Sequence, residues 1–163
     1  MPLEIERQFL VRVRLLPKLE GGRRIEQAYL SASPEVRVRL IDDDRAYITV
    51  KSDGGITREE YEYPIPPDHA RSMLELTPWF PILKTRYSLE LDGHVWEIDR
   101  YDGENEGLWS AEVELASEDE ALELPAWLGE EVTDERRFKN KNLAQQPFAT
   151  WADRERFVAL LEG

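Results

Sequence analysis

The sequence predicts a mainly antiparallel β fold with eight strands and a few short helices. Apolar and polar residues alternate with a period of two over most of the chain, which is the pattern of strands with one buried face. Clusters of Asp, Gly, Ser and Pro interrupt the alternation at regular intervals and indicate turns. Helical periodicity is limited to short stretches. Evenly spaced antiparallel strands with few helices are typical of a barrel or a sandwich.

The alternating segments give the predicted strands in chain order. They cover residues 3–11, 27–32, 35–41, 45–52, 57–65, 81–91, 94–101 and 109–116. The turn segments "SASPE", "DDDR" and "SDGG" separate the second to fifth strands. The segment "LDGH" predicts a hairpin with Asp92 and Gly93 at its tip.

Three short helices are predicted outside the strands. Asp68 is placed to cap a helix over "HARSMLEL". Ser117 and Glu120 form a capping-box pattern ahead of a second helix over "EDEALEL". Thr150 is expected to cap a terminal helix of residues 150–162.

The composition limits the classes of function. The chain of 163 residues is 41% apolar with five Trp, so one domain with a packed core is expected over residues 1–163. The net charge of -13 argues against general binding of nucleic acid or of an anionic membrane. A small phosphorylated ligand is still compatible with this charge if the basic residues are concentrated locally.

Metal and targeting signals narrow the classes further. The chain has no Cys and two His, which excludes thiolate metal sites and argues against a multi-His zinc site. No apolar run approaches ~20 residues, and the chain starts on a charged strand with no secretory signal. We therefore expect a soluble cytoplasmic protein.

Alternation also sorts the charged residues by strand face. In the first strand Glu4, Glu6 and Gln8 share one face, because residues i and i+2 point the same way. The other strands carry same-face charges at Arg37 and Arg39, Lys51, Arg58, Glu60 and Glu62, Lys84 and Arg86, Glu97 and Asp99, and Glu112 and Glu114.

These charged faces have two interpretations. The solvent face of an ordinary antiparallel sheet would be charged as well, and the protein would then be a structural or partner-binding β protein. A solvated surface usually intersperses the two signs, however, whereas here acidic and basic strands are distinct. If the faces line a barrel interior, the charges must be paired or must meet ions. Carboxylates suit Mg²⁺ or Mn²⁺, and Arg and Lys suit a polyanion, which together indicate metal-assisted phosphoryl chemistry.

The order of the charged segments resembles the CYTH superfamily of triphosphate tunnel metalloenzymes. That family's signature is E-x-E-x-K, V-R-x-R, a strand ending in Lys, R-x-E-x-E, K-x-R and a late E-x-E. Here these motifs read "EIERQ", "VRVR", "ITVK", "REEYE", "KTRY" and "EVE", in the same order. Each motif is weak alone, but six in order are specific. The resemblance runs from "EIERQFLV" to "EVTDERRFKNKNLA", which is nearly the whole chain.

The resemblance implies an eight-stranded closed antiparallel tunnel barrel with a few flanking helices, an α+β fold that binds a triphosphate with Mg²⁺ or Mn²⁺. By motif position, the residues that would bind phosphate are Arg37, Arg39, Lys51, Lys84 and Arg86, assisted by Arg58 and Arg136. The leading metal ligands would be Glu4, Glu6, Glu112 and Glu114, with Glu60, Glu62 and Asp99 as further ligands or as partners of the basic residues. A homodimer is a further implication of the resemblance.

The wording "EIER…FLV", "KSDGG", "KTRY" and "EEVT" is most similar to short bacterial inorganic tripolyphosphatases. The resemblance therefore implies metal-dependent hydrolysis of inorganic triphosphate, with Glu4, Glu6 and Gln8 at the reacting centre. Thiamine triphosphatases and class IV adenylyl cyclases belong to the same superfamily and are alternatives. The sequence has no obvious pocket for a purine or a thiamine, because most Tyr and Trp alternate onto the apolar faces.

Gln8 departs from the family pattern, which has Lys at this position. Gln has no charge and cannot act as an acid or a base, but its amide donates and accepts hydrogen bonds. Four interpretations follow: reduced activity, orientation of water by the amide, a binding protein without turnover, or a laboratory substitution. Loss of general acid–base assistance typically costs ~10²–10⁴ in rate.

Overall fold

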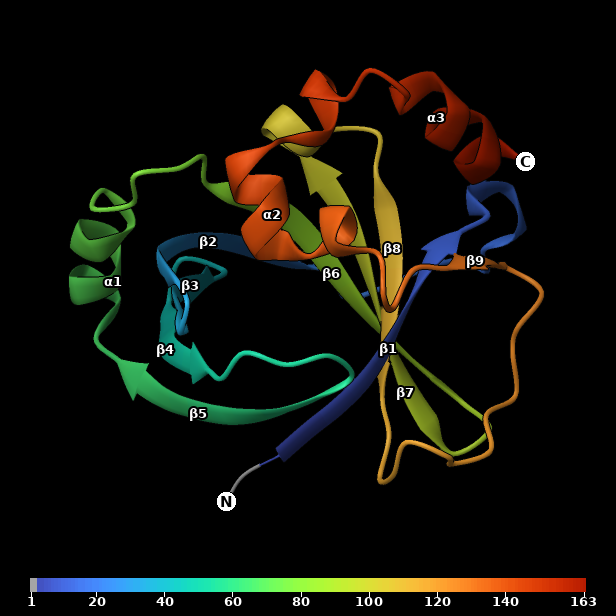
Figure 1. The fold of residues 1–163 in the computed structure, drawn as a ribbon, viewed down its shortest axis with the longest axis horizontal. Coiled ribbons are helices and arrows are strands. Elements are labelled where there is room, and N and C mark those ends of the chain that lie inside the picture. The colour runs from blue at the N-terminus through green and yellow to red at the C-terminus, as the bar shows by residue number, and fades with distance from the viewer. Residues whose placement is uncertain (1–2) are drawn as a thin grey trace.

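A computed structural model describes residues 3–163, and a closed antiparallel barrel forms its main body (Figure 1). The strands are β1 (Leu3–Val11), β2 (Arg23–Ala32), β3 (Glu35–Ile41), β4 (Arg45–Lys51), β5 (Thr57–Ile65), β6 (Ile82–Leu91), β7 (His94–Asp102), β8 (Trp109–Glu114) and β9 (Leu128–Glu131). Their order is β5-β4-β3-β2-β6-β7-β8-β1-β9, and a further pairing of β5 with β1 closes the first eight strands into a barrel. The predicted eight-stranded closed barrel is confirmed.

Strand β1 closes the barrel by pairing on both edges. One edge pairs with β8 over residues 6–10, and the other pairs with β5 over residues 3–5. The second half of that other edge pairs with β9 instead, where Phe9 faces Glu131. The ninth strand was not predicted, because the four residues "LGEE" are too few to show alternation. Strand β2 starts four residues earlier than expected, since "RRIE" pairs with β6.

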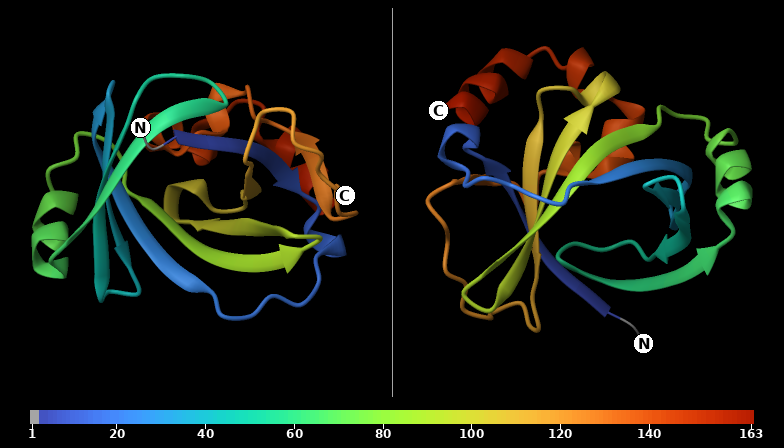
Figure 2. Two further views of the ribbon diagram at one scale, coloured as in Figure 1. Left: turned by 90° about the horizontal axis from the view of Figure 1, so that it is seen from below. Right: turned by 180° about the vertical axis from the view of Figure 1, so that it is seen from behind.

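The helices lie outside the barrel wall. They are α1 (Pro67–Leu74), α2 (Asn140–Gln145) and α3 (Arg154–Glu162), with 3-10 turns η1 (Val13–Leu15), η2 (Gly103–Asn105), η3 (Arg136–Phe138) and η4 (Phe148–Thr150). Helix α1 covers β2, β3 and β4, whereas α2 and α3 lie away from α1, over other parts of the barrel (Figures 1 and 2). None of the helices within residues 3–163 is long and apolar enough to cross a membrane.

Three predicted helix features are wrong. Asp68 lies in the first turn of α1 and pairs with Arg71 at 2.7 Å instead of capping the helix. Residues 118–124 form no helix, because the Glu120 carboxylate accepts a hydrogen bond from the backbone N–H of Ala116 and contacts His94. The terminal helix starts at Arg154, and the hydroxyl of Thr150 donates to the carbonyl of Pro147 within η4.

The apolar core lies mainly outside the barrel. Val38, Leu40 and Ala46 of β3 and β4 pack against Ala70 of α1. A second cluster, on the outer faces of β1, β7 and β8, includes Phe9 and Trp96. Because these side chains alternate with the charged residues, the charged face of each strand points into the barrel.

One end of the barrel interior is apolar and is covered by residues 136–163, which we call the cap. The strand residues Leu10, Ile82 and Tyr101 form one cluster with the cap residues Phe138, Leu143, Phe148, Phe157 and Leu161. Arg137 fixes the start of the cap: its guanidinium lies 4.5 Å from the Trp151 ring centroid and 5.1 Å from that of Phe157, and pairs with Asp153 at 2.9 Å. The interior faces therefore change from charged to apolar along the same strands.

Candidate active site

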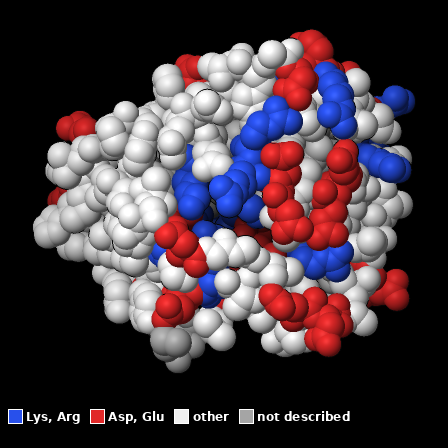
Figure 3. Space-filling view, in the orientation of Figure 1, with Lys and Arg blue, Asp and Glu red and all other residues white. Residues whose placement is uncertain are grey.

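The charged faces of the strands enclose a cavity of about 260 Å³ inside the barrel. Strand register explains the lining, because residues opposite each other in antiparallel strands share a face. Glu6 lies opposite Glu114, and Gln8 lies opposite Glu112. The predicted site residues that line the cavity are Glu4, Glu6, Gln8, Arg37, Arg39, Lys51, Arg58, Glu60, Glu62, Arg86, Glu112 and Glu114. Figure 3 shows basic and acidic side chains gathered around a hollow in this face.

Three predicted residues lie elsewhere. Lys84 and Asp99 are fully buried in the barrel wall, beside the cavity. Arg136 is exposed and lines a second cavity of about 680 Å³, which adjoins the first because both share Glu4, Glu6, Arg58 and Lys139. The loop of residues 53–56 and the segment of residues 133–145 contribute to the lining of this second cavity.

The predicted site did not include five polar residues of the first cavity: Tyr29, Glu35, Glu97, Lys139 and Asn140. Alternation had placed Glu97 on the charged face with Asp99 without giving it a role, and it could also have identified Glu35, two residues before Arg37 on the same face. No strand periodicity identifies Lys139 or Asn140, because they lie just before and at the start of α2, after the barrel in sequence.

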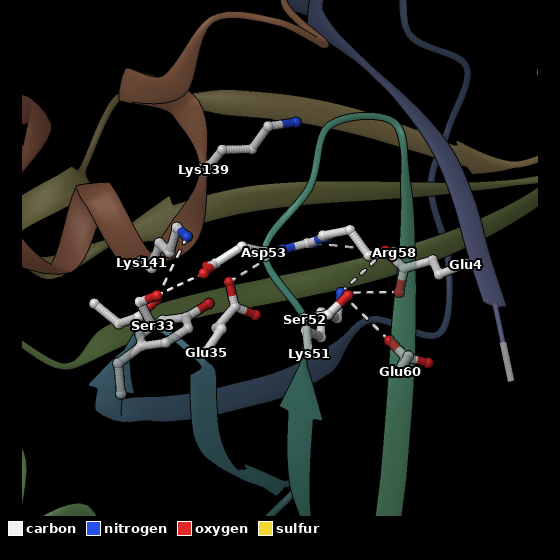
Figure 4. Close-up of polar contacts among 12 residues, drawn as sticks. Glu4, Ser33, Glu35, Lys51, Ser52, Asp53, Arg58, Glu60, Lys139 and Lys141 are labelled. Atoms are coloured by element: carbon white, nitrogen blue, oxygen red, sulfur yellow. Dashed lines mark hydrogen bonds and ion pairs between the residues drawn. The ribbon is translucent and has the colours of Figure 1, made fainter. Parts of the chain in front are cut away.

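The cations Lys51 and Arg58 have carboxylate partners (Figure 4). The ammonium of Lys51 lies 2.8 Å from Glu4 and 3.3 Å from Glu60. The guanidinium of Arg58 lies 3.3 Å from Glu35 and 3.7 Å from Glu4. This corner of the cavity is therefore an internally neutralised network.

Asp99 neutralises the cations of β6. Its carboxylate accepts from Lys84 at 2.8 Å and from Arg86 at 2.7 and 2.8 Å. Burial opposes the ionisation of Asp99, but the charges of Arg86 and Lys84 outweigh it and hold its pKa well below the usual range. The bidentate contact also fixes the guanidinium plane of Arg86.

Arg37 and Arg39 of β3 are different, because neither forms an ion pair within the described part of the chain, residues 3–163. The Nε of Arg37 is buried without a hydrogen-bond partner, and the Nε of Arg39 donates to the Gln27 amide oxygen at 2.8 Å. Burial, together with the charges of Arg37 and Arg86, lowers the pKa of Arg39. Tyr29, Glu35 and Glu4 raise the pKa of Arg37 against the cost of burial, so the poorly compensated charge is that of Arg39, as expected of a site that receives an anion.

The acidic residues form two carboxylate pairs, Glu4 with Glu60 and Glu6 with Glu112. Burial and the hydrogen bond to Glu4 raise the pKa of Glu60 to about 7. Burial and the charge of Glu112 raise the pKa of Glu6 well above its usual range. In each pair the second carboxyl ionises less readily than an isolated one, because two adjacent buried charges repel each other.

A divalent cation fits this donor set, because it would relieve the repulsion within each pair. The described residues contain no preassembled group of three His, Cys, Asp or Glu ligands, which agrees with the pairing of Glu4 to Lys51 and of Asp99 to β6. Glu6, Glu112 and Glu114, which lie on paired strands, are therefore the best-placed ligands.

The side chain of Gln8 is hydrogen-bonded to the first residues of the cap. Its amide nitrogen donates to the carbonyl of Phe138 at 3.2 Å, and its amide oxygen accepts from Lys139 Nζ at 3.3 Å. Burial lowers the pKa of Lys139, although the charges of Glu112 and Glu6 oppose this shift. A cation thus lies beside position 8, but it comes from a distant part of the chain.

Comparison with known proteins agrees with this geometry. The model of the CYTH domain family matches residues 2–146. An inorganic triphosphatase of Acetivibrio thermocellus is 39% identical over 94% of this chain and 100% of its own length. One of Nitrosomonas europaea is 39% identical over 86% of this chain and 96% of its own length. A crystal structure of an inorganic triphosphatase superposes with a TM-score of 0.65 at 37% identity, covering 88% of this chain and 95% of the other.

Proposed function

This chain belongs to the CYTH domain family, and from that premise we propose that it hydrolyses inorganic triphosphate with the help of a divalent metal ion. The relatives named inorganic triphosphatases support the substrate class. One structural observation carries the proposal: the guanidiniums of Arg37 and Arg39, neither of which is held in an ion pair, line one cavity with the carboxylate pairs Glu4–Glu60 and Glu6–Glu112. A volume of about 260 Å³ favours a compact ligand over a bulkier one, since pockets for drug-sized ligands span roughly 300–1,000 Å³.

The cations of the cavity bind the phosphate chain. Arg37 and Arg39 donate hydrogen bonds to phosphate oxygens, because neither guanidinium is held in an ion pair. Arg86, Lys51 and Arg58 contribute positive potential from fixed positions in their ion pairs. Fixed cations stabilise the charge that spreads over the transferred phosphoryl group and the leaving diphosphate.

The carboxylates hold the metal and accept a proton. Glu6, Glu112 and Glu114 would hold Mg²⁺ or Mn²⁺, with Glu4 beside them. When bound, the ion supplies charge neutralisation on the phosphate chain and lowers the pKa of a water molecule. Glu60 has a pKa of about 7, so near neutral pH its carboxylate can take the proton that the attacking water loses.

Phosphate release from tripolyphosphate tests the proposal. We expect release with Mg²⁺ or Mn²⁺ that stops with EDTA, and a loss of at least tenfold in kcat/KM for Arg39→Ala and for Glu112→Gln. Arg45→Ala is the matched control, because Arg45 is an exposed residue of β4 outside both cavities. Absence of metal-dependent release, or equal effects of Arg39→Ala and Arg45→Ala, would contradict the proposal.

A substrate panel separates the alternatives within the family. Cyclic AMP formed from ATP would indicate a cyclase, and faster turnover of thiamine triphosphate than of tripolyphosphate would indicate a thiamine triphosphatase. Tight binding of tripolyphosphate without turnover would indicate a binding protein. The single domain over residues 1–163, the homodimer and the cytoplasmic location stay predictions, and light scattering in solution measures the oligomeric state.

A further inference from the structure

Lys139 is a cavity cation that the barrel strands do not supply. It lies between η3 and α2 at the start of the cap, and it lines the same cavity as Glu6, Gln8 and Glu112. Figure 4 shows its side chain extending from the cap segment, with no dashed line to the Lys51 and Arg58 network. The cap thus contributes a positive charge to an enclosure that is otherwise built from strands.

Hydrogen bonds from both the backbone and the side chain of Gln8 join it to residues 132–139, which lead into and begin the cap. The backbone N–H of Gln8 donates to Thr133 Oγ1 at 3.0 Å, and its carbonyl accepts from the N–H of Val132 at 2.8 Å. The side-chain amide donates to the carbonyl of Phe138 and accepts from Lys139 Nζ. Because the Phe138 carbonyl can only accept, it fixes the orientation of the amide and turns its oxygen to Lys139.

The ammonium of Lys139 has donors left for a ligand. Its one hydrogen bond in the described structure, to Gln8 Oε1, uses one of three N–H donors. Lys139 forms no ion pair within residues 3–163, whereas Lys51 and Lys84 each bind a carboxylate at 2.8 Å. A partly buried ammonium that borders a cavity and lacks a counter-ion is stabilised by an anion that enters the cavity.

The fold also restrains the position of Lys139. Two residues before it, Arg137 is stacked on Trp151 and Phe157 and paired with Asp153. One residue after it, Asn140 accepts a hydrogen bond from the hydroxyl of Tyr101 at 2.7 Å. Anchors on both sides reduce the entropy that Lys139 loses when it meets a ligand.

We infer that Lys139 is a substrate-binding residue of the proposed triphosphatase, that its ammonium donates hydrogen bonds to an oxygen of the bound phosphate chain, and that Gln8 positions it. This inference rests on the proposed function. Gln8 then positions the ammonium of Lys139 without carrying a charge itself. Lys139 thus supplies a positive charge beside position 8, although residue 8 is neutral. A lysine there would instead place a second ammonium against Lys139.

A double-mutant cycle tests the inference with tripolyphosphate as the substrate. Lys139→Met keeps the length of the side chain and removes its charge, and we expect kcat/KM to fall about 10- to 150-fold, the equivalent of one hydrogen bond to a charged group. Gln8→Met should lower kcat/KM by a smaller factor. The double variant should match Lys139→Met alone, because Gln8 acts through Lys139.

Lys141→Met is the matched control. Lys141 belongs to the same segment, contacts the carbonyl of Ala32 and lines the second cavity, but it does not line the first, so it tests whether a lysine must border the first cavity to affect turnover. We expect its kcat/KM to stay within twofold of the unmodified protein. Circular dichroism and thermal unfolding verify the fold, and Lys139→Arg provides a charged variant that should retain more activity than Lys139→Met.

The outcomes separate this inference from the proposed function. If the unmodified protein releases no phosphate with metal, the proposed function fails first. If it is active and Lys139→Met keeps its kcat/KM, or Lys141→Met loses as much, Lys139 does not bind substrate. If the losses in kcat/KM (as free energies) of the Gln8 and Lys139 variants add in the double variant, Gln8 does not act by positioning Lys139. Calorimetric titration with tripolyphosphate gives a readout that does not require turnover, and a folded Lys139→Met with unchanged affinity would also overturn the inference.

Discussion

Strands β3 and β6 each carry two cations at or beside the same cavity, but the surroundings of these cations differ. Lys84 and Arg86 of β6 share the buried carboxylate of Asp99, whereas Arg37 and Arg39 of β3 have no carboxylate within ion-pair distance in residues 3–163. Both β6 cations are thus held in ion pairs by one carboxylate, although burial and the charges of Arg86 and Arg39 still lower the pKa of Lys84 to about 7. On β3, Tyr29, Glu35 and Glu4 raise the pKa of Arg37 against the cost of burial, whereas burial and the neighbouring cations lower that of Arg39. Arg39 is therefore the cation that gains most when an anion enters.

The difference separates a structural task from a binding task. A buried cation with a fixed partner contributes to a rigid wall, and removing its partner leaves a charge that water cannot reach. A buried cation without a partner costs stability in the empty protein and gains that energy back when a ligand binds. The cation pairs of β3 and β6 thus have different energetic roles. Mutations in the two strands should therefore affect different quantities, ligand affinity for β3 and stability for β6.

The largest expected effect comes from removing the carboxylate that pairs with both cations of β6. Asp99→Ala leaves Lys84 and Arg86 buried without a counter-charge, so we expect the free energy of unfolding to fall by about 3–5 kcal/mol. Urea unfolding measures it. Glu97→Ala is the control, because Glu97 lies on the same face of β7, is partly exposed and pairs weakly with Arg23 at 3.4 Å. Its loss should stay below about 1 kcal/mol. Equal losses in both variants would remove the distinction.

Arg39→Ala gives the next largest effect, and it should act on affinity instead of stability, because the pKa of Arg39 is lowered in the folded protein. We expect the affinity for tripolyphosphate to fall about 10- to 150-fold, because a hydrogen bond to a charged group is lost. The free energy of unfolding of the ligand-free protein should stay equal or rise, since a poorly compensated charge disappears. Calorimetry and urea unfolding measure the two quantities. A stability loss as large as that of Asp99→Ala would show that Arg39 has a structural role instead of a binding role.

The smallest effect is a dependence of stability on pH. The pKa of Asp99 is lower in the folded protein than the unfolded value of about 3.9, so its stabilisation is complete above that pH and is lost as the pH falls towards the folded value. The Asp99→Asn variant should therefore lose less stability than the unmodified protein between pH 4 and lower pH. Asp102→Asn, an exposed change on the same strand, should keep the unmodified slope. Parallel slopes in all three proteins would contradict the assignment.

The sequence could predict which residues face the barrel interior, but not which of them form internal ion pairs and which are left to bind a ligand. Strand alternation is local, so Glu4, Arg37 and Glu112 could be placed on one face without knowledge of the fold. The pairing of Asp99 with β6 could not be distinguished from a metal-binding role, because strand register and distances decide it. The Ser117 and Glu120 pattern misled for a related reason: the contact of Glu120 with His94 joins residues that only the fold brings together.

Lys139 marks the limit of sequence reasoning. It is 131 positions from Gln8 along the chain and belongs to no periodic element, so nothing local relates the two. The departure at position 8 was visible in the sequence. The neighbouring cation became visible only when the cap was seen against β1.

The stacking of Arg137 within the cap has a thermal consequence. The cap is stabilised partly by aromatic and ionic contacts among its own residues, whereas the barrel is stabilised by a closed series of hydrogen-bonded strands. Units of this kind open independently, with the less extensively bonded unit opening first. Opening of the cap withdraws Lys139 while the barrel persists. Heating should therefore cost activity several degrees before the strands melt, and hydrogen exchange should be faster in residues 136–163 than in β6 and β7.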